Sequence, residues 1–400
     1  MKKILSIVIS AAAIALPLCP AASYSADTAS GIEYEIADKQ ITVTGCTAKG
    51  IVEIPSEING LPVTSIADGA CAGNEDIIKC ILPDSIKKVG AKAFSNCPNL
   101  SNVTLGKNLS DIGDYAFTAC PSLTLIKVAA GNPTYTSNTG SLYKNDTLVL
   151  YAGLSHALMS DDTKVIGKGA FFGRSDIDMV RIPSGVASIG DYAFSGCLSL
   201  KNAKIPDNVT TLGKGCFMSC SSLENVSFGK SLKTIPESCF HSCSSLKNVP
   251  ITDNITSIGD NAFYSCSNIE RLYIPPTVTS IGKDALGRRY DVRSSSTENI
   301  PDFVIRVKTG SAAEKYASEY GISFVEYSLK KGDINDDFFV DAVDASLLLA
   351  EYARISSGKA QMFSEEQKKA ADWNGDGITD AVDASCVLKE YVRLSAAENA

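Results

Sequence analysis

One feature constrains the fold of this chain more than any other: a short unit of constant length that recurs along most of the sequence. Each unit carries a marker pair, an aliphatic residue followed in most copies by Gly. Consecutive markers are evenly spaced, except across one gap that is more than twice as long, from Ile112 to Ile166. A fixed, short period predicts a solenoid, because one unit can bury its apolar face only against its neighbours. The markers begin at Val89, Ile112, Ile166, Ile189, Leu212, Ile235, Ile258 and Ile281, with a variant at Ile66.

Apolar residues follow each marker at fixed distances. An aromatic residue comes five positions later, and a Cys comes eight positions later in most units. Apolar residues at positions eleven, fourteen and sixteen then form L-x-x-L-x-L, which is typical of a leucine-rich repeat with a short, half-buried strand. We interpret these ladders as core packing and not as chemistry. The aromatic ladder comprises Phe94, Phe117, Phe171, Phe194, Phe217, Phe240 and Phe263.

The unit from Ile182 to Leu200 reads I-P-x-x-V-x-x-I-G-x-x-A-F-x-x-C-x-x-L. This pattern resembles the leucine-rich repeat of BspA-like bacterial surface proteins, and the resemblance covers about residues 30 to 328. It implies an α/β repeat solenoid, a leucine-rich repeat horseshoe with short strands, and a surface adhesion or interaction role without catalytic residues. The ladder Cys is replaced by Asn74, Arg174 and Arg289 in three units.

Composition narrows the functional classes. A net charge of −8 gives no reason to expect a nucleic-acid or anionic-membrane partner. The two histidines, His156 and His241, leave little room for histidine catalysis or a His-rich metal site. Thirteen cysteines in an exported chain would favour disulfides. The regular ladder instead favours buried, reduced thiols and a reducing habitat.

The N-terminus has the pattern of a secretory signal. Lys2 and Lys3 precede an apolar run, and small residues end it at about Ala26. The run is too short for a membrane span. We therefore expect a signal peptide at 1–26 and a secreted, extracellular protein that associates with a scaffold or the cell surface, with no membrane span.

Between the signal and the second module, residues 27–328 are assigned to the repeat domain and its caps. Residues 31 to 61 alternate like a β-hairpin and are expected to cap the first coil. The long gap is expected to hold an excursion with two short strands. After the last marker, we expect a polar loop from Arg288 to Glu298, then a strand, a helix from Ser311 to Tyr320 and a second strand.

A different module begins near residue 332 with two copies of D-x-N-x-D-x-x-x-D-x-x-D, which start at Asp333 and Asp372. Oxygen ligands at positions 1, 3, 5, 9 and 12, with a backbone carbonyl at position 7, suit calcium. An acidic solvated loop is the alternative, which the matching spacing of two copies disfavours. We expect two calcium ions whose binding is coupled to folding. The candidate ligands are Asp333, Asn335, Asp337, Phe339, Asp341 and Asp344, and Asp372, Asn374, Asp376, Ile378, Asp380 and Asp383.

Each loop leads into an apolar helical pattern, and a short helix at about 364–371 links the copies. Two such loop–helix units resemble a dockerin module of cellulosomes over residues 332–396, a small all-α calcium-binding domain that docks onto a cohesin. Phe338 replaces the Gly of loop position 6 in the first copy, which implies a weaker first site. The resemblance implies cohesin contacts at Ala342, Val343, Ala350, Glu351 and Arg354, and at Ala381, Val382, Lys389, Glu390 and Arg393.

These patterns favour a secreted, non-catalytic interaction protein of a cellulosome-type complex. The alternatives are a glycoside hydrolase, for which no pair of carboxylates across a sugar cleft is indicated, and a structural adhesin or spacer. Near-identical loop–helix halves raise the hypothesis of two docking orientations. The repeat strands present a polar strip that suits a protein or glycan ligand. Solvated polar residues on a strand face without a ligand would give the same pattern. That strip comprises Asn202, Lys204, Asn225, Ser227, Asn248, Arg271 and Tyr273.

Overall fold

The computed structural model describes residues 23–27, 31–247, 249–327, 329–335 and 340–398. The chain divides into two compact units. The first comprises Met1–Ile305 with Gly310–Phe324, and the second comprises Arg306–Thr309 with Val325–Ala400. The first unit is a solenoid and the second is helical, so the expected fold class is confirmed.

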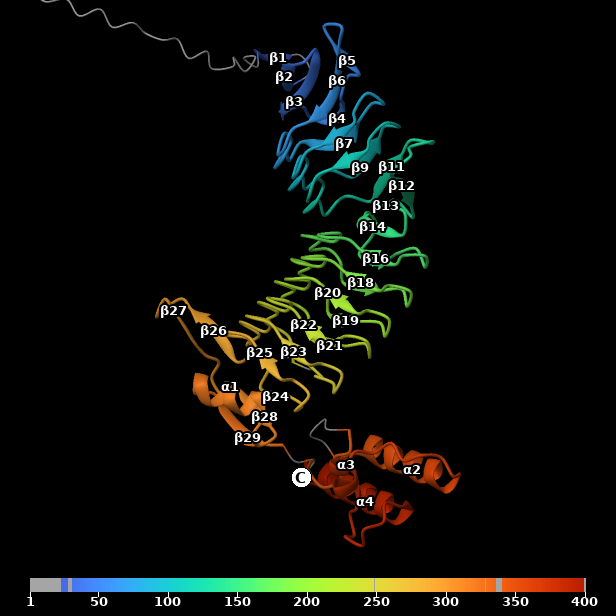
Figure 1. The fold of residues 1–400 in the computed structure, drawn as a ribbon, viewed down its shortest axis with the longest axis vertical. Helices are drawn as coiled ribbons and strands as arrows, with labels where there is room; N and C mark the ends of the chain where they lie inside the picture. Colours follow the sequence, from blue (N-terminus) through green and yellow to red (C-terminus); the bar gives the residue numbers. More distant parts are fainter. Residues whose placement is uncertain (1–22, 28–30, 248, 328, 336–339, 399–400) are drawn as a thin grey trace, which may run out of the picture. The chain divides into compact units, whose positions relative to one another are not determined.

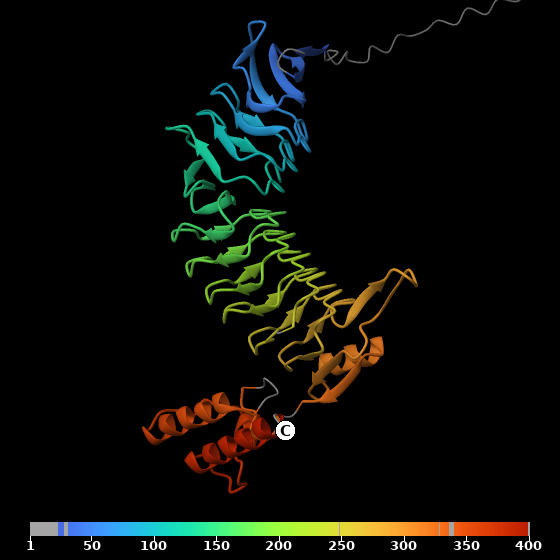
Figure 2. The same cartoon turned by 180° about the vertical axis from the view of Figure 1, so that it is seen from behind.

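Successive coils of the first unit stack side by side along the solenoid axis (Figures 1 and 2). The strand expected at the end of each unit is present, and its residues alternate between buried and exposed. Neighbouring strands pair in parallel, so that each residue lies beside its equivalent in the next coil, as Asn202 lies beside Asn225. These strands, which we call the strand face, are β4 (Gly50–Glu53), β7 (Ile77–Ile81), β9 (Asn102–Leu105), β11 (Leu125–Val128), β15 (His156–Leu158), β17 (Met179–Arg181), β19 (Asn202–Lys204), β21 (Asn225–Ser227) and β24 (Arg271–Tyr273).

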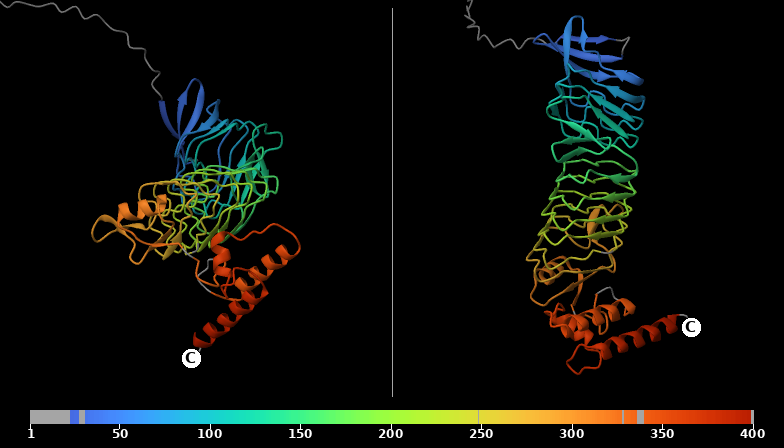
Figure 3. Two further views of the ribbon diagram at one scale, coloured as in Figure 1. Left: turned by 60° about the horizontal axis from the view of Figure 1, so that its bottom comes forward. Right: turned by 90° about the vertical axis from the view of Figure 1, so that its right-hand side faces the viewer.

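A second line of parallel strands forms at the markers, which the sequence analysis did not predict. Most of these strands are very short, and each ends at the marker residue. The right-hand view of Figure 3 shows the coils stacked as successive layers. The coils connect strands of the strand face to strands at the markers. The marker strands are β6 (Leu61–Ile66), β8 (Lys88–Val89), β10 (Asp111–Ile112), β16 (Val165–Ile166), β18 (Ser188–Ile189), β20 (Thr211–Leu212), β22 (Thr234–Ile235), β23 (Ser257–Ile258) and β25 (Ser280–Ile281).

The Gly of the marker pair is required by the neighbouring coil. A Cβ atom built on Gly190 would lie 2.7 Å from the backbone N of Lys168, and one on Gly213 would lie 2.2 Å from the N of Asp191. Real Cβ atoms do not approach backbone this closely, so a side chain at either of these two positions would force the neighbouring coil to shift. The marker pair therefore encodes both a strand and the spacing between coils.

In the coils from Ile66 to Ile258, two residues adopt a left-handed backbone, three and seven positions after the marker. Tyr192 has φ 54° and Gly196 has φ 75°. Left-handed residues interrupt a right-handed helix, so the segment after each marker turns tightly without forming one. The same two positions are left-handed in the next coil, at Gly215 (φ 59°) and Ser219 (φ 61°).

The aromatic ladder lies in the core as expected. The rings of Phe194 and Phe217 stack with centroids 5.0 Å apart and planes 3° apart, and both side chains are fully buried. Stacked rings with small offsets gain about 0.5–1.5 kcal/mol beyond their buried area. The ladder thus links each coil to the next by the same contact.

The cysteine ladder does more than fill space. Except for Cys97, which donates to the carbonyl of Cys71, each ladder Sγ donates a hydrogen bond to the carbonyl of the ladder Phe one coil earlier, at 3.1 Å from Cys220 to Phe194 and 3.1 Å from Cys243 to Phe217. Burial raises the pKa of Cys266 to about 12, which keeps the thiol of Cys266 protonated and able to donate. The Cys therefore satisfies a backbone carbonyl that faces the core.

The long gap contains an abbreviated coil as well as an excursion. Two strands were expected there, and the structure has three antiparallel ones: β12 (Thr136–Asn138), β13 (Ser141–Lys144) and β14 (Thr147–Leu150). β14 also pairs in parallel with β16, which places Leu148 beside the marker Ile166. Tyr151 stacks on Phe171 at 4.7 Å and so continues the aromatic ladder. The stack of coils resumes with Tyr151 in place of a ladder Phe.

The ends of the solenoid are covered by non-repeat elements. At the N-terminus, β2 (Ile32–Ala37) and β3 (Gln40–Cys46) form the expected antiparallel hairpin, and β1 (Ser23–Asp27) pairs with β2. β5 (Glu57–Ile58) pairs antiparallel with the marker strand β6. Residues 1–22 of the expected signal peptide lie outside the described residues.

At the C-terminal end, the polar stretch expected to be a loop is instead a hairpin. β26 (Arg288–Asp291) pairs with β27 (Ser296–Asn299), and Arg289 and Glu298 face each other across the strands with Nη2 and Oε1 2.6 Å apart. Two strands follow, β28 (Val304–Val307) and β29 (Ser323–Glu326), on either side of α1 (Ala312–Tyr320). Ser311 caps α1, as expected.

The second unit contains α2 (Ala342–Ser356), α3 (Glu365–Ala371) and α4 (Ala381–Glu398). α2 begins inside the first acidic loop, because the side chain of Asp341 caps the helix and the carboxylate of Asp344 accepts a hydrogen bond from the backbone N–H of Asp341. Its apolar core is small and lies between α2 and α4, which contact each other. The buried apolar residues are Ile334, Val340, Ala345, Leu348, Ala371, Ala384 and Val387.

Candidate calcium loops and partner-binding surfaces

The second acidic loop is described in full, whereas the first is described only in part. Asp333, Asn335, Asp341 and Asp344 of the first loop are placed. Three positions of interest, Asp337, Phe338 and Phe339, lie outside the described residues.

In the second loop, Asp372 at position 1 organises the backbone. Its Oδ1 accepts hydrogen bonds from the N–H groups of Gly375 and Asp376 at 2.8 and 3.0 Å, and its Oδ2 accepts one from Gly377 at 3.0 Å. Gly377, at loop position 6, has φ 81°, which Gly adopts without strain. The chain therefore curls around the first carboxylate.

The Asp at position 12 closes both loops in the same way. Asp383 Oδ1 accepts from the N–H groups of Trp373 and Asn374, and Oδ2 accepts from the N–H of loop position 9. Asp344 repeats this arrangement with Ile334, Asn335 and Asp341. Both carboxylates are fully buried. The shorter side chain of Asp, compared with the Glu of an EF-hand, thus fastens the start of the loop to the start of the helix.

The donor chemistry of the loops fits calcium. The side chains at positions 1, 3, 5, 9 and 12 of the second loop offer oxygen ligands, and a carboxylate oxygen that accepts one N–H keeps a further lone pair. Within the described part of the chain, no three His, Cys, Asp or Glu side chains form a ready metal-binding group. The ion would supply the positive charge that the buried carboxylates need.

Most of the residues expected to contact a cohesin are accessible. Val343 and Val382 are 52% and 55% exposed, and the neighbouring Ala342 and Ala381 are accessible as well. On the helices, Ala350, Lys389 and Arg393 are exposed. Equivalent positions of the two loop–helix units thus lie on accessible helix faces.

Glu351 is the exception, and the structure corrects its expected role. Only 4% of this residue is exposed. Its carboxylate accepts hydrogen bonds from the backbone N–H groups of Met362 and Phe363 in the segment that links the two copies. A carboxylate that is buried and used inside the domain is not a surface contact, because removing it from those partners would leave them unsatisfied.

The two helices differ at this point despite their similar sequences. Arg354 of α2 also donates to the linking segment, at 2.7 Å to the carbonyl of Ala360. The equivalent pair on α4, Glu390 and Arg393, forms a two-bond ion pair at 2.7 Å instead. Each carboxylate therefore has a different partner, and the two halves are not interchangeable in structure.

On the strand face, the polar strip is placed as expected where it is described. The side chain of Asn225 donates to that of Asn202 at 2.9 Å, and Lys204 pairs in register with Ser227. Asn248 lies outside the described residues. Met179 and Arg181, which were not predicted to belong to this strip, precede Asn202 and Lys204 by one period and occupy the same columns. The constant spacing of the repeat itself carried that signal.

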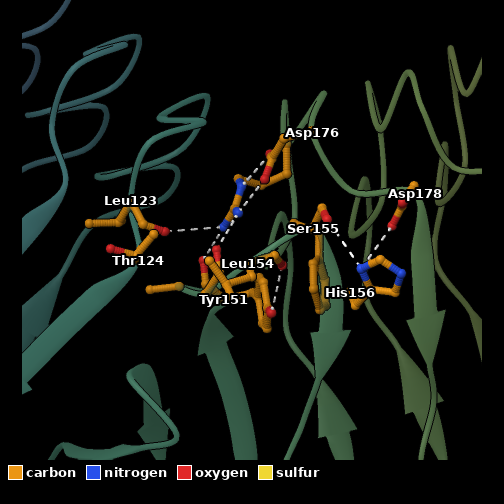
Figure 4. Close-up of polar contacts among 12 residues, drawn as sticks. Leu123, Thr124, Tyr151, Leu154, Ser155, His156, Asp176 and Asp178 are labelled. Atoms are coloured by element: carbon orange, nitrogen blue, oxygen red, sulfur yellow. Dashed lines mark hydrogen bonds and ion pairs between the residues drawn. The ribbon is translucent and has the colours of Figure 1, made fainter.

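Arg174 replaces the ladder Cys directly after the abbreviated coil. Its guanidinium is 3% exposed and donates to the carbonyls of Leu123, Tyr151 and Gly153 and to both carboxylate oxygens of Asp176. Figure 4 shows Leu123, Tyr151 and Asp176, which come from before, within and after the insert. A thiol offers one donor, so the larger number of carbonyls at this joint explains the change to Arg.

A Ser, a His and an Asp lie together near this joint (Figure 4). Ser155 Oγ is 3.3 Å and Asp178 Oδ1 is 3.7 Å from the same atom, Nδ1 of His156. A catalytic triad needs Ser and Asp on opposite ring nitrogens, so that one orients the base that the other uses. This trio does not have that geometry, and His156 lies on the surface as expected.

Two family patterns match the chain. The BspA type leucine rich repeat region matches in six copies over residues 52–148 and 164–292, and the dockerin type I domain matches over residues 331–392. No curated protein sequence matches. Within the described residues, no helix is both long and apolar enough to cross a bilayer.

Similar solved structures include a leucine-rich repeat protein of Eubacterium ventriosum, at 17% identity over 63% of this chain and 82% of the other, with a TM-score of 0.42. A leucine rich cell surface protein of Faecalibacterium prausnitzii shares 20% identity over 68% and 96%, with a TM-score of 0.33. The pneumococcal vaccine antigen PcpA shares 16% identity over 77% and 99%, with a TM-score of 0.45.

Proposed function

Because this chain belongs to the BspA type leucine-rich repeat proteins and carries a type I dockerin domain, we propose that it is a secreted, non-catalytic interaction protein. In this proposal the dockerin, residues 332–396, docks onto a cohesin of a cellulosome-type scaffold. The repeat domain, residues 27–328, presents the strand face to a further ligand. The signal peptide at 1–26 directs export.

The observation that carries the docking half is the repeated loop–helix unit. Both copies close their loop through the same three hydrogen bonds to the Asp at position 12, so both are built to fold around a cation. We propose that two calcium ions bind, one in each loop. The carbonyls of Phe339 and Ile378 and the oxygen side chains of both loops act as the ligands, with Asp337 among them.

The engagement of Glu351 and Arg354 by the linking segment favours one docking surface over the other. On α4, Lys389 and Arg393 are both exposed. On α2, the corresponding residues are Ala350, Glu351 and Arg354. Glu351 and Arg354 bond to the linking segment, which leaves Ala350. We propose that the α4 half contributes more to cohesin binding, so that one of the two possible orientations dominates.

The non-catalytic assignment is supported by the site geometry. The Ser–His–Asp group near the insert lacks triad geometry, and the repeat and dockerin families are non-catalytic modules. Detectable hydrolysis of a glycan or peptide by the purified full chain would contradict this assignment.

The docking proposal is tested with the full chain and a panel of immobilised type I cohesins, by surface plasmon resonance. Binding to at least one cohesin is expected in calcium and not in chelator. The double variant Lys389→Glu and Arg393→Glu is expected to weaken binding at least tenfold. The variant at the equivalent positions of α2, Ala350→Glu and Arg354→Glu, should weaken it less. Equal losses would contradict the preference for α4, and binding in chelator would contradict the docking mechanism.

A further inference from the structure

The strand face has a charge that differs from the rest of the chain. Its outward side chains form two columns, fixed by the register between neighbouring strands. Among the described residues of these columns, Glu53 is the only carboxylate, although the whole chain has 45 Asp and Glu and a net charge of −8. The cations in the columns are Lys79, Lys127, Arg181, Lys204 and Arg271.

The same columns expose aliphatic side chains. Leu158 is 62% exposed and Met179 is 57% exposed, on adjacent strands in the middle of the solenoid. Ile51 and Leu125, nearer the N-terminus, are 64% and 45% exposed. Aliphatic residues gathered on one face of a soluble protein mark an interaction surface more often than single, scattered ones do.

Cations and aliphatic residues alternate at the centre of this face. β15 pairs with β17 so that His156 faces Met179 and Leu158 faces Arg181. One period later, Asn202 and Lys204 continue the two columns on β19. We call His156, Leu158, Met179, Arg181, Asn202 and Lys204 the central patch.

Two carboxylates flank the central patch without neutralising it. Asp161 lies 3.7 Å from Arg181, and both side chains are more than two-thirds exposed. Asp178 lies 3.7 Å from His156. Such exposed pairs are weak and leave the guanidinium able to bind a second anion.

We propose that the central patch binds an extended acidic peptide segment of a partner protein, with carboxylates on Arg181 and Lys204 and aliphatic side chains on Leu158 and Met179. This deepens the proposed function, because it rests on the strand face being the ligand surface. An acidic polysaccharide would satisfy the cations, but it has no aliphatic side chains to cover Leu158 and Met179. Glycan and nucleic-acid sites also use flat aromatic rings, and the central patch has no Phe, Tyr or Trp.

The test uses the full chain in calcium and fluorescence anisotropy. The probe is a labelled peptide of alternating Glu and Leu, and the comparison peptides alternate Lys with Leu and Glu with Ser. The Glu-Leu peptide is expected to bind at least tenfold more tightly than either, and more weakly as salt increases. Equal binding of the Lys-Leu peptide would overturn the proposal.

Variants separate the two contributions. Arg181→Glu with Lys204→Glu is expected to weaken binding at least tenfold. Leu158→Ser with Met179→Ser is expected to weaken it about fivefold, since these exposed positions bury apolar area only in the complex. The control, Lys107→Glu with Lys230→Glu, makes the same charge change at exposed positions outside the columns and should alter affinity less than twofold.

The outcomes also distinguish this proposal from the one on which it rests. Two results together would overturn the inference in favour of an acidic polysaccharide. Polygalacturonate would compete with the peptide for binding, and the Leu158→Ser with Met179→Ser variant would bind as tightly as the wild-type chain. If surface extracts are captured by the wild-type chain and not by the Arg181 and Lys204 variant, while the Glu-Leu peptide fails to bind, the strand face remains the ligand surface and only the peptide assignment falls.

Discussion

The solenoid and the helical module are stabilised by different kinds of interaction. In the solenoid, each coil repeats the same ring stack, thiol hydrogen bond and parallel strand pairs with its neighbour. In the helical module, a small set of buried apolar residues surrounds loops that bury the carboxylates of Asp333, Asp344 and Asp383. The solenoid is therefore stable through repetition, whereas the module depends on compensation of buried negative charge.

This difference implies that the two regions respond independently to most perturbations. Substitutions in a coil are expected to act on contacts with the neighbouring coils, because each unit of a repeat stack packs against its neighbours. Removal of a cation acts on the helical module alone. The predictions below follow from this contrast, beginning with the largest effect.

Chelation of calcium is expected to unfold the helical module and leave the solenoid folded. Without a cation, the buried carboxylates repel one another, and the helices α2 and α4 that begin inside the loops lose their starting points. Far-UV circular dichroism of the full chain should lose most of its helical signal in chelator. Asp383→Ala should lower the measured calcium stoichiometry by one ion. A helical signal that survives chelation would contradict the contrast.

Arg174→Ala is expected to destabilise the solenoid by about 3–5 kcal/mol, the loss typical when one partner of a buried ion pair is removed. The variant leaves the carbonyls of Leu123, Tyr151 and Gly153 without their donor at the joint after the insert. Urea denaturation monitored by β-sheet signal measures the effect. Arg181→Ala, an exposed arginine nearby, should change stability by less than about 0.5 kcal/mol. An unchanged midpoint for Arg174→Ala would show that the joint does not depend on it.

A single position of the cysteine ladder, Cys220, tests whether the solenoid uses the thiol for its hydrogen bond or only for its apolar volume. If the thiol of Cys220 acts only as apolar filling, Ala should replace it better than Ser. Because its Sγ donates to the carbonyl of Phe194, we expect the reverse order: Cys220→Ser destabilises less than Cys220→Ala, with a difference of about 1 kcal/mol. Thermal denaturation of the two variants at equal calcium concentration decides between these outcomes.

The smallest expected effect is a pH dependence at His241. Burial lowers the pKa of His241 below its ordinary value, so at mildly acidic pH the unfolded chain binds a proton that the folded chain does not. The stabilising contribution is complete above about pH 6.5 and declines as the pH falls below it, by less than about 1 kcal/mol for this half-buried side chain. His241→Gln should remove that part of the dependence. Parallel pH profiles for the two proteins would refute this assignment.

Part of the repeat architecture was hidden from the sequence for a physical reason. In the abbreviated coil of the insert, Leu148 takes the marker position although it precedes Ile166 by less than one full period, and Tyr151 stands where a ladder Phe would be. Neither the period nor the residue type marks it as a coil. Its membership depends on the pairing of β14 with β16, which brings Leu148 beside Ile166 in space.

The candidate partner-binding residues likewise divide into features that the sequence spacing predicted and features that depend on contacts between distant segments. The spacing of the two acidic loops predicted which oxygens lie near a cation, because ligands of one loop are close in sequence. The spacing did not show that Glu351 turns inward while Glu390 pairs with Arg393. Those two outcomes differ because the linking segment passes beside α2, a contact between residues eleven or more positions apart.

The sequence by itself determined the solenoid, the helical calcium module and the residues of both ladders, since each rests on spacings within one coil or one loop. Only the tertiary structure decided what the ladder thiols donate to, why Arg174 interrupts them, and that His156 and Leu158 of the insert join the central patch. These depend on which groups from different coils come within hydrogen-bond distance. That proximity is set by the stacking of whole coils and not by any local pattern.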